Sequence, residues 1–281
     1  MIRQEKTTDR KWVNRLNKES SILFTICARA GSKGVKGKNT KIFCGRPLVA
    51  YTVAAYELFR QRFQTEYGSM ALAVNTDSEL LRQQLDELRT EYLYIPRIEE
   101  LAGDVVSKKD VIRDTLIKSE TEKNRIFDVV IDLDLTSPLR TVDDIKGTLE
   151  ALNQDEGADI AYSVTASRRS PYFNMVAKGD DGYYHTVTQT GFTTRQQCPS
   201  CYDMNASIYA YRRAYTLADH VLPRREAVWQ MKDTGVLDID SEEDFELMEV
   251  LAKYFYQKYP AYGEIEAAAS APGGQCGGNM L

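Results

Sequence analysis

Five basic residues and three glycines gather in one segment, RAGSKGVKGKNTK at 29–41, with no carboxylate among them. Glycine lets the backbone approach a ligand closely and turn its N–H groups toward an anion. The segment follows an apolar run at 21–27 that is typical of a buried strand, and open α/β sheets bind ligands at the carboxyl ends of their strands. We therefore predict a loop that binds a polyphosphate. The alternative is a solvated basic turn, because a run of charge usually lies on the surface.

The glycine spacing does not fit the two best-known phosphate loops. A Walker loop has two glycines five residues apart, followed by Lys and then Ser or Thr. Here Gly31 and Gly37 are six apart, and Lys38 is followed by Asn39. The dinucleotide fingerprint reads Gly-x-Gly-x-x-Gly, whereas this loop reads Gly-x-x-Gly-x-x-Gly. The loop belongs to neither class.

Two aspartates in the pattern Asp-x-Asp, Asp238 and Asp240, end a second apolar segment. The period of two along a strand places both carboxylates on one face. Mg²⁺ usually takes one or two carboxylates together with substrate phosphates, so the pair predicts a Mg²⁺ site. Alternatively, Asp240 caps the helix that follows and Asp238 pairs with a basic side chain.

The same pattern recurs at Asp132 and Asp134, after the apolar run at 127–133. Hydroxyl groups and an arginine follow it in the segment TSPLR at 136–140, where a nucleotide can bind. The alternative is that Asp134 and Arg140 form a local salt bridge that positions the loop.

Composition excludes several classes of protein. The net charge of −5 makes the chain a poor binder of nucleic acid or of an anionic membrane. No apolar run reaches the length of a membrane-spanning helix, and the polar first twenty residues do not resemble a secretory signal. Five scattered cysteines favour reduced thiols over a disulfide framework. We expect a cytoplasmic protein with no nucleic-acid or membrane partner.

Apolar runs alternate along the chain with helical patterns, which predicts an α/β fold: a mostly parallel sheet with helices on both faces. The alternation fails over 168–201, where Gly and Pro lie among aromatic residues, so this stretch is expected to extend outside the main sheet. We expect a loose N-terminal arm over 1–20, one folded domain over 21–260 and a disordered tail over 261–281. The predicted strands are 21–27, 70–74, 92–95, 127–133, 158–164, 205–211 and 236–240, and the predicted helices are 47–60, 78–89, 108–119, 141–152 and 241–259.

Seven motifs together resemble the acylneuraminate cytidylyltransferases, the family of CMP-sialate synthetases, in order and over residues 21–258. Three segments, DLDLTSPLR, RRSPYFN and DMNASIY, are more similar to the branch that acts on legionaminic-acid-type sugars. The motifs are ARAGSKGVKGKN, VNTDS, PRIEELAGD, DLDLTSPLRTVDDI, TRQQ, NASIYAYRR and LDIDSEEDF.

The resemblance implies a Rossmann-like fold of the nucleotide-diphospho-sugar transferase type over 21–260. It implies a reaction in which CTP and a nine-carbon 2-keto-3-deoxy sugar acid give CMP-sugar and pyrophosphate, with Mg²⁺ as cofactor. A homodimer is implied as well, with 168–201 as the dimerisation arm.

Site roles follow from the resemblance by position. The catalytic residues are expected to be Arg29, Lys38 and Arg195, and the metal ligands Asp238 and Asp240. Nucleotide-binding roles are expected for Arg29, Gly31, Ser32, Lys33, Asn39, Arg97 and Ser107. Sugar-binding roles are expected for Asp134, Ser137, Arg140, Arg168, Tyr172, Phe173, Gln196 and Asn205. For Tyr172 and Phe173, packing within the arm is an equal alternative, since buried aromatic side chains mostly pack.

The chain departs from many sialate enzymes at two positions, with Asp134 in place of Gln and Asp203 in place of Arg. Both changes make the sugar pocket more acidic and favour a sugar other than neuraminate.

Two other functions stay open: a cytidylyltransferase for an eight-carbon keto-deoxy acid of the 3-deoxy-manno-octulosonate type, and a nucleotide-binding regulatory protein without catalysis. Cys198 and Cys201 form a C-x-x-C motif, but a zinc site would need a second pair of ligands and a redox site a thioredoxin context, and the sequence has neither.

Overall fold

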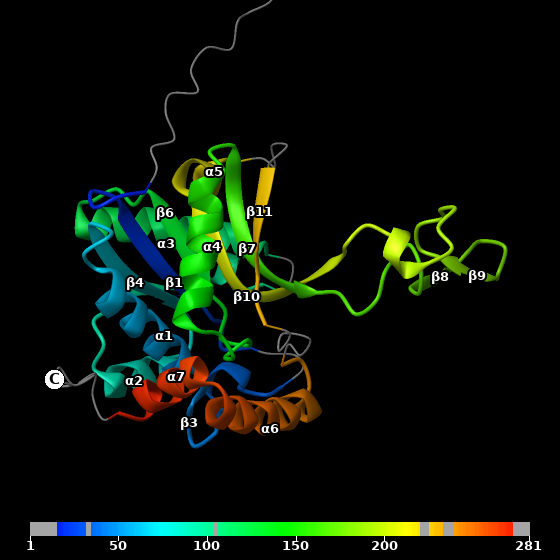
Figure 1. The fold of residues 1–281 in the computed structure, drawn as a ribbon. Helices are drawn as coiled ribbons and strands as arrows, with labels where there is room; N and C mark the ends of the chain where they lie inside the picture. Colours follow the sequence, from blue (N-terminus) through cyan, green and yellow to red (C-terminus); the bar gives the residue numbers. More distant parts are fainter. Residues whose placement is uncertain (1–15, 32–34, 104–105, 220–224, 233–238, 272–281) are drawn as a thin grey trace, which may run out of the picture.

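Seven strands form a central sheet in a computed structural model, which describes residues 16–31, 35–103, 106–219, 225–232 and 239–271 (Figure 1). β10 runs antiparallel to both of its neighbours, and every other pair in the sheet is parallel. The predicted, mostly parallel sheet is confirmed. The order across the sheet is β11 (Arg225–Gln230), β7 (Ala158–Ala166), β10 (Tyr202–Arg212), β6 (Val129–Leu133), β1 (Ser21–Cys27), β4 (Ser69–Thr76) and β5 (Leu93–Pro96).

Helices cover both faces of the sheet, as the alternating pattern predicted. Successive residues of β1 point to opposite faces: Ile22 and Phe24 join one apolar core, while Leu23 joins the other. The larger core includes residues of α1 (Leu48–Phe63), α2 (Glu79–Leu88), α4 (Val142–Gln154), α6 (Glu242–Lys258) and α7 (Pro260–Ser270). The smaller core includes residues of α3 (Lys108–Lys123) and α5 (Arg213–Leu217).

Side-chain caps fix where the helices near the site begin. The hydroxyl of Ser107 accepts a hydrogen bond from the backbone N–H of Lys109 and starts α3. Thr141 with Asp144 and Ser241 with Asp244 form capping boxes at α4 and α6. Such caps satisfy N–H groups that have no partner within the helix.

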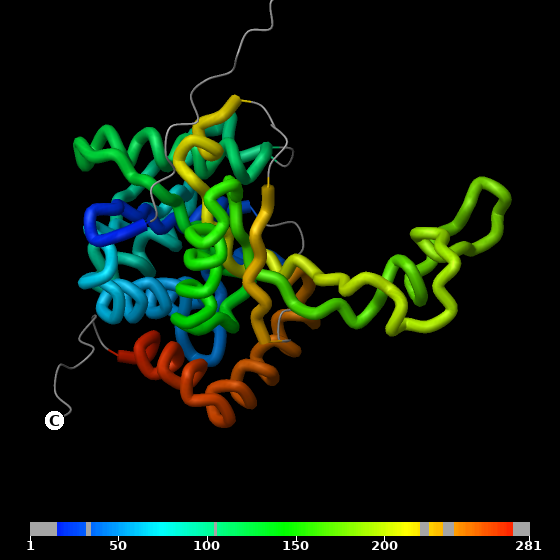
Figure 2. The backbone as a smooth tube through the Cα atoms, turned by 45° about the horizontal axis from the view of Figure 1, so that its top comes forward, coloured from blue at the N-terminus to red at the C-terminus, as the bar shows by residue number. Residues whose placement is uncertain are grey.

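The residues between β7 and β10 leave the body of the molecule as an extended arm, as expected for 168–201 (Figures 1 and 2). The arm carries a separate two-stranded hairpin, β8 (Val176–Lys178) and β9 (Tyr184–Thr186), and a short 3₁₀ turn at Arg195–Gln197. The role of the arm in dimerisation stays a prediction.

The expectation of a disordered tail over 261–281 is wrong for its first half. Residues Pro260–Ser270 form α7, which packs on α1 and buries Tyr262, Ile265 and Ala269. Arg62 of α1 also pairs with Glu264 of α7 at 2.7 Å. The three buried residues are spaced so that they share one face of the helix, a pattern that the Ala-rich composition concealed. Residues 272–281 of the expected tail lie outside the described part of the chain.

Two other expectations need correction. β11 was not predicted, because its sequence, REAVWQ, mixes charged and apolar residues at the edge of the sheet. The strand expected at 236–240 lies mainly outside the described residues, and Ile239 and Asp240 are not in a strand. Residues 1–15 of the expected N-terminal arm also lie outside the described part, while Leu16 packs against the larger core.

None of the described helices is long and apolar enough to cross a lipid bilayer.

Gly147 of α4 offers a test of how tightly β11 packs. A Cβ atom at this position would lie 2.3 Å from the ring of Trp229. Gly-to-Ala changes inside a helix usually stabilise by about 1 kcal/mol, but overpacking costs about 1–3 kcal/mol. We predict that Gly147→Ala lowers the free energy of unfolding, measured by urea denaturation. In a Trp229→Ala background the same change should stabilise the protein. A stabilising effect in the wild-type background would contradict this packing.

Candidate active site

A cleft of about 410 Å³ lies just beyond the carboxyl ends of β1, β5 and β6. Open α/β sheets bind their ligands at this edge. The cleft brings together residues that lie far apart in the sequence, and seven of those singled out above line it: Arg29, Gly31, Lys38, Asn39, Arg97, Asp134 and Asp240.

The basic loop meets the segment before α6 inside this cleft. The Nζ atom of Lys38 lies 3.3 Å from Oδ1 of Asp240 and donates a hydrogen bond to the carbonyl of Ile239. Lys38 is largely buried, with 16% of its side chain exposed, whereas Asp240 is 80% exposed. The cationic loop and the late aspartate, which were predicted separately as a phosphate-binding and a metal-binding element, therefore meet in one cleft.

Asp240 does not cap α6. Ser241 is the N-cap, and its capping box uses the carboxylate of Asp244, which also accepts a hydrogen bond from the backbone N–H of Asp240 at 3.2 Å. The carboxylate of Asp240 is thus left exposed at the cleft, where a cation can reach it. Asp238, Ser32 and Lys33 lie outside the described residues, so their predicted roles stay predictions.

Hydrogen bonds hold the basic loop in shape. Gly37 has a left-handed backbone (φ 64°), which glycine adopts without strain, and a 3₁₀ turn follows it. The side chain of Asn39 donates to the carbonyl of Arg29 at 3.0 Å. The N–H of Ala30 donates to the carboxylate of Asp77 at 2.6 Å. Asn39 therefore shapes the loop, and Asp77, which sequence reasoning missed, anchors it.

Arg97 is oriented by a second residue that sequence reasoning missed. Its guanidinium donates to the side chain of Asn75 at 2.8 Å and to the carbonyl of Asn75 at 3.2 Å. Asn75 is fully buried, and burial lowers the pKa of Arg97. Asn75 and Asp77 both lie at or just past the end of β4, so the rule that ligands bind at strand ends was the signal that could have found them.

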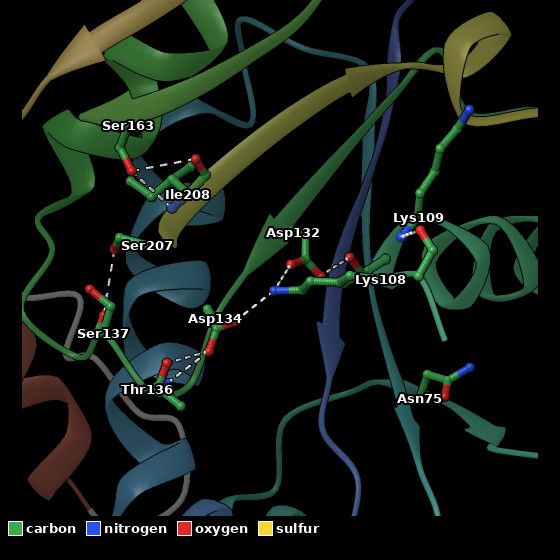
Figure 3. Close-up of polar contacts among 12 residues, drawn as sticks. Asn75, Lys108, Lys109, Asp132, Asp134, Thr136, Ser137, Ser163, Ser207 and Ile208 are labelled. Atoms are coloured by element: carbon green, nitrogen blue, oxygen red, sulfur yellow. Dashed lines mark hydrogen bonds and ion pairs between the residues drawn. The ribbon is translucent and has the colours of Figure 1, made fainter. Parts of the chain in front are cut away.

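Lys108 links the two aspartates at the end of β6 (Figure 3). Its Nζ atom lies 2.7 Å from Oδ2 of Asp132 and 2.6 Å from Oδ2 of Asp134. Thr25 donates to the other oxygen of Asp132, and Thr136 donates twice to the other oxygen of Asp134. Lys108 was not predicted as a site residue, and no motif in the sequence marked it.

This ion pair decides the charge of Asp134. Burial alone would raise the pKa of Asp134, but the adjacent ammonium of Lys108 outweighs it and holds this pKa well below its usual range. Burial would likewise lower the pKa of Lys108, but the two carboxylates raise it well above its ordinary value. Asp134 is therefore an anion near neutral pH and a poor general base.

Arg140 supports the loop from within the protein. Its side chain is 1% exposed, and its guanidinium donates to the backbone carbonyls of Asp134 and Ser137. The local pairing considered from the sequence thus uses the carbonyl of Asp134 and not its carboxylate. Burial lowers the pKa of Arg140 to about 10. Ser137 and Asn205 are also buried, and none of these three expected sugar-binding residues lines the cleft.

Neither Ser107, which lies between the lining residues Val106 and Lys108, nor the expected residues of the arm line the cleft. Ser107 caps α3. Arg195 and Gln196 line a second hollow of about 340 Å³ at the base of the arm, together with Cys198 and Cys201, which are free thiols. The remaining arm residues also lie outside the cleft: Arg168, Tyr172, which packs against Phe192 at 6.3 Å between ring centroids, and the exposed Phe173.

The Asp134–Lys108 pair predicts a pH effect on stability. Because the folded-state pKa of Asp134 is depressed, its contribution is present above the unfolded pKa of about 3.9 and is lost as the pH falls through the folded value. Asp134→Asn should therefore destabilise the protein near neutral pH, and the gap to wild type should narrow below about pH 4. Urea denaturation across this range measures it; a gap that does not depend on pH would contradict the assignment.

Two solved structures share this fold. One, a CMP:2-keto-3-deoxy-manno-octonic acid synthetase complexed with CTP, has a TM-score of 0.57 and 18% identity, and the match covers 84% of this chain and 99% of that one. The other, 4-diphosphocytidyl-2C-methyl-D-erythritol synthase from Anaerococcus prevotii, has a TM-score of 0.53 and 12% identity, and covers 83% and 99%. At such identities the likeness concerns the fold alone.

Sequence comparison goes further. "Post-translational flagellin modification protein B" of Campylobacter coli is 36% identical over 83% of this chain and 96% of its own length. The CMP-N,N'-diacetyllegionaminic acid synthase of Campylobacter jejuni is 36% identical over 83% and 95%. The N-acylneuraminate cytidylyltransferase of Streptococcus agalactiae is 27% identical over 78% and 50%. The family model described as cytidylyltransferase matches residues 23–259, and the chain belongs to that family.

Proposed function

We propose that this protein transfers the CMP group of CTP to the anomeric hydroxyl of a nine-carbon 2-keto-3-deoxy sugar acid and releases pyrophosphate. The observation that carries the proposal is the contact between Lys38 and Asp240 in the cleft, which sets a phosphate-binding cation beside a carboxylate that can hold a metal ion. The relative named for legionaminic acid is 36% identical, against 27% for the one named for N-acylneuraminate, which favours a legionaminic-type acceptor.

The cationic wall of the cleft suits the triphosphate. Arg29, Lys38 and Arg97 all line it. As pyrophosphate leaves, negative charge builds up on the departing oxygens, and fixed cations stabilise that charge. Loop contacts with Asn39 and Asp77 hold Arg29 and its neighbours in place before the ligand arrives.

Asp240, the acidic partner in the contact with Lys38, is suited to hold Mg²⁺. The carboxylate of Asp240 is a hard oxygen ligand, is 80% exposed and lines the cleft beside Lys38. We propose that Asp240, with Asp238 two residues earlier, holds Mg²⁺. When bound, the ion would neutralise charge on the phosphates.

Positioning and charge neutralisation, without a dedicated base, are proposed to drive the transfer. Asp134 and Asp240 are the carboxylates that line the cleft among the described residues. The pKa of Asp134 is held too low for proton abstraction, so this side chain acts as a hydrogen-bond acceptor. Arg195, on the arm, is proposed to pair with the carboxylate of the sugar, since a guanidinium matches a carboxylate at two points.

A homodimer accounts for the position of Arg195 and for the surface of the arm. Arg195 does not line the cleft of its own chain. Large exposed apolar patches are typical of protein interfaces. The arm exposes many large apolar side chains: Phe173, Met175, Val176, Tyr183, Tyr184, Val187 and Phe192. We propose that each arm covers the cleft of the partner.

A panel of acceptors tests the reaction. With CTP and Mg²⁺, we expect pyrophosphate release with at least one of legionaminic, neuraminic and pseudaminic acids. Asp240→Asn should lower kcat by about 100-fold or more, because a metal ion supplies several kcal/mol of charge stabilisation. Glu242→Gln, an acidic neighbour that pairs with Lys41, is the control and should keep its activity. Turnover of an eight-carbon acid alone would favour the octulosonate alternative, and CTP binding without any turnover the regulatory one.

Mixed dimers test the arm. Lys38→Ala and Arg195→Ala should each be nearly inactive. In a random mixture, half of the dimers contain one chain of each kind, and one of their two sites is intact if Arg195 acts on the partner's cleft. We therefore expect about a quarter of wild-type activity to return on mixing, given a symmetric dimer. No recovery, with dimers verified by sedimentation, would show that Arg195 does not act across the interface.

A further inference from the structure

Lys108 is the cation nearest to the acidic end of the cleft. It is the first residue of α3, and its ammonium lies between Asp132 and Asp134, at 2.7 Å and 2.6 Å (Figure 3). Asp132 is completely buried, while Lys108 is 37% exposed and lines the cleft with Asp134. The ion pair therefore runs from the protein interior to the surface that a ligand touches.

One N–H of this ammonium is left for a ligand. An ammonium group has three N–H bonds; one donates to Asp134 at 2.6 Å, and a second side of the ammonium faces Asp132 in an ion pair at 2.7 Å. The ring of Tyr209 lies 5.7 Å from Nζ and closes one side. Lys108 lines the cleft, so the third donor is available to an oxygen there.

Charge explains why the site needs this lysine. Both proposed substrates are anions, and two unpaired carboxylates, Asp134 at the cleft and Asp132 buried behind it, would repel them. The ammonium of Lys108 cancels one negative charge and holds Asp134 in one orientation. Thr136 fixes the other oxygen of Asp134 through two hydrogen bonds of 2.9 Å and 2.8 Å. Since a carboxylate has about four acceptor positions, Asp134 keeps room for a hydroxyl donor.

We propose that Lys108 is a positioning residue for the sugar acid, a role that rests on the proposed function. It presents the carboxylate of Asp134 to a hydroxyl of the acceptor and prevents that carboxylate from repelling the anionic substrate. The cleft that Lys108 lines also holds Arg97 and the residues that follow β6, where nucleotide and acceptor would meet.

The test distinguishes the effect of losing Lys108 beside Asp134 from the effect of leaving the buried carboxylate of Asp132 unpaired. In Lys108→Gln/Asp132→Asn the net charge is unchanged, no buried carboxylate is left unpaired at position 132, and Thr25 can still donate to that residue. The only carboxylate that loses its charged partner, Lys108, is then Asp134. We expect the KM for the sugar acid to rise about tenfold, the factor that corresponds to 1.4 kcal/mol, and the KM for CTP to change little. Adding Asp134→Asn should reverse much of the rise, because the unpaired charge is removed.

Lys109→Gln is the matched control. The neighbouring lysine donates to the carbonyl of Ala218 at 3.0 Å and does not line the cleft, so its loss should leave both KM values unchanged. If Lys108 only held α3 in place, the double variant would alter both KM values or the melting temperature, and Asp134→Asn would restore nothing; either result overturns the role. Absence of turnover by the wild-type protein with every acid would instead overturn the proposed function, and this role with it.

Discussion

Lys38 and Asp240 join two segments that lie 202 residues apart in the chain. The contact depends on β1, which carries the basic loop, and on the capping box that starts α6 one residue after Asp240. Because Lys38 is largely buried, its charge needs a counter-charge even before a ligand binds. Under the proposed function, an arriving triphosphate would compete with Asp240 for the same ammonium, and a metal ion on Asp240 would ease the exchange.

The need of a buried charge for a counter-charge also shapes the acidic end of the cleft. A buried carboxylate such as Asp132 is costly unless it is paired and hydrogen-bonded, and Lys108 and Thr25 meet both needs. Arg140 serves the loop after β6 by donating to its carbonyls. Charged residues that could all bind a ligand, judged from the sequence, thus have two different positions in the fold. Some, such as Asp134, line the cleft, and others, such as Asp132 and Arg140, are buried and support its wall.

The sheet and most helices could be predicted because apolar periodicity and caps are local signals, as in SILFTIC at 21–27 and the Ser241–Asp244 box. The cleft residues of the basic loop could be predicted because glycine and charge mark it directly. Lys108 could not, since its role arises only when α3 packs beside β6. The burial of Arg140 and Asn205 could not be predicted, because residue type does not reveal burial. The helix α7 was missed because its small apolar residues resemble a low-complexity tail.

The arm has a consequence for how such a protein can change over evolution. It leaves the sheet from the end of β7 and returns at the start of β10, where Ala166 and Tyr202 are paired neighbours. An insertion between two strands that already pair lengthens a loop without shifting the register of the sheet, and loop length itself costs little. Mutations can therefore lengthen, shorten or change the surface of the arm, and with it the proposed dimer, while the cleft at the other strand ends stays as it is.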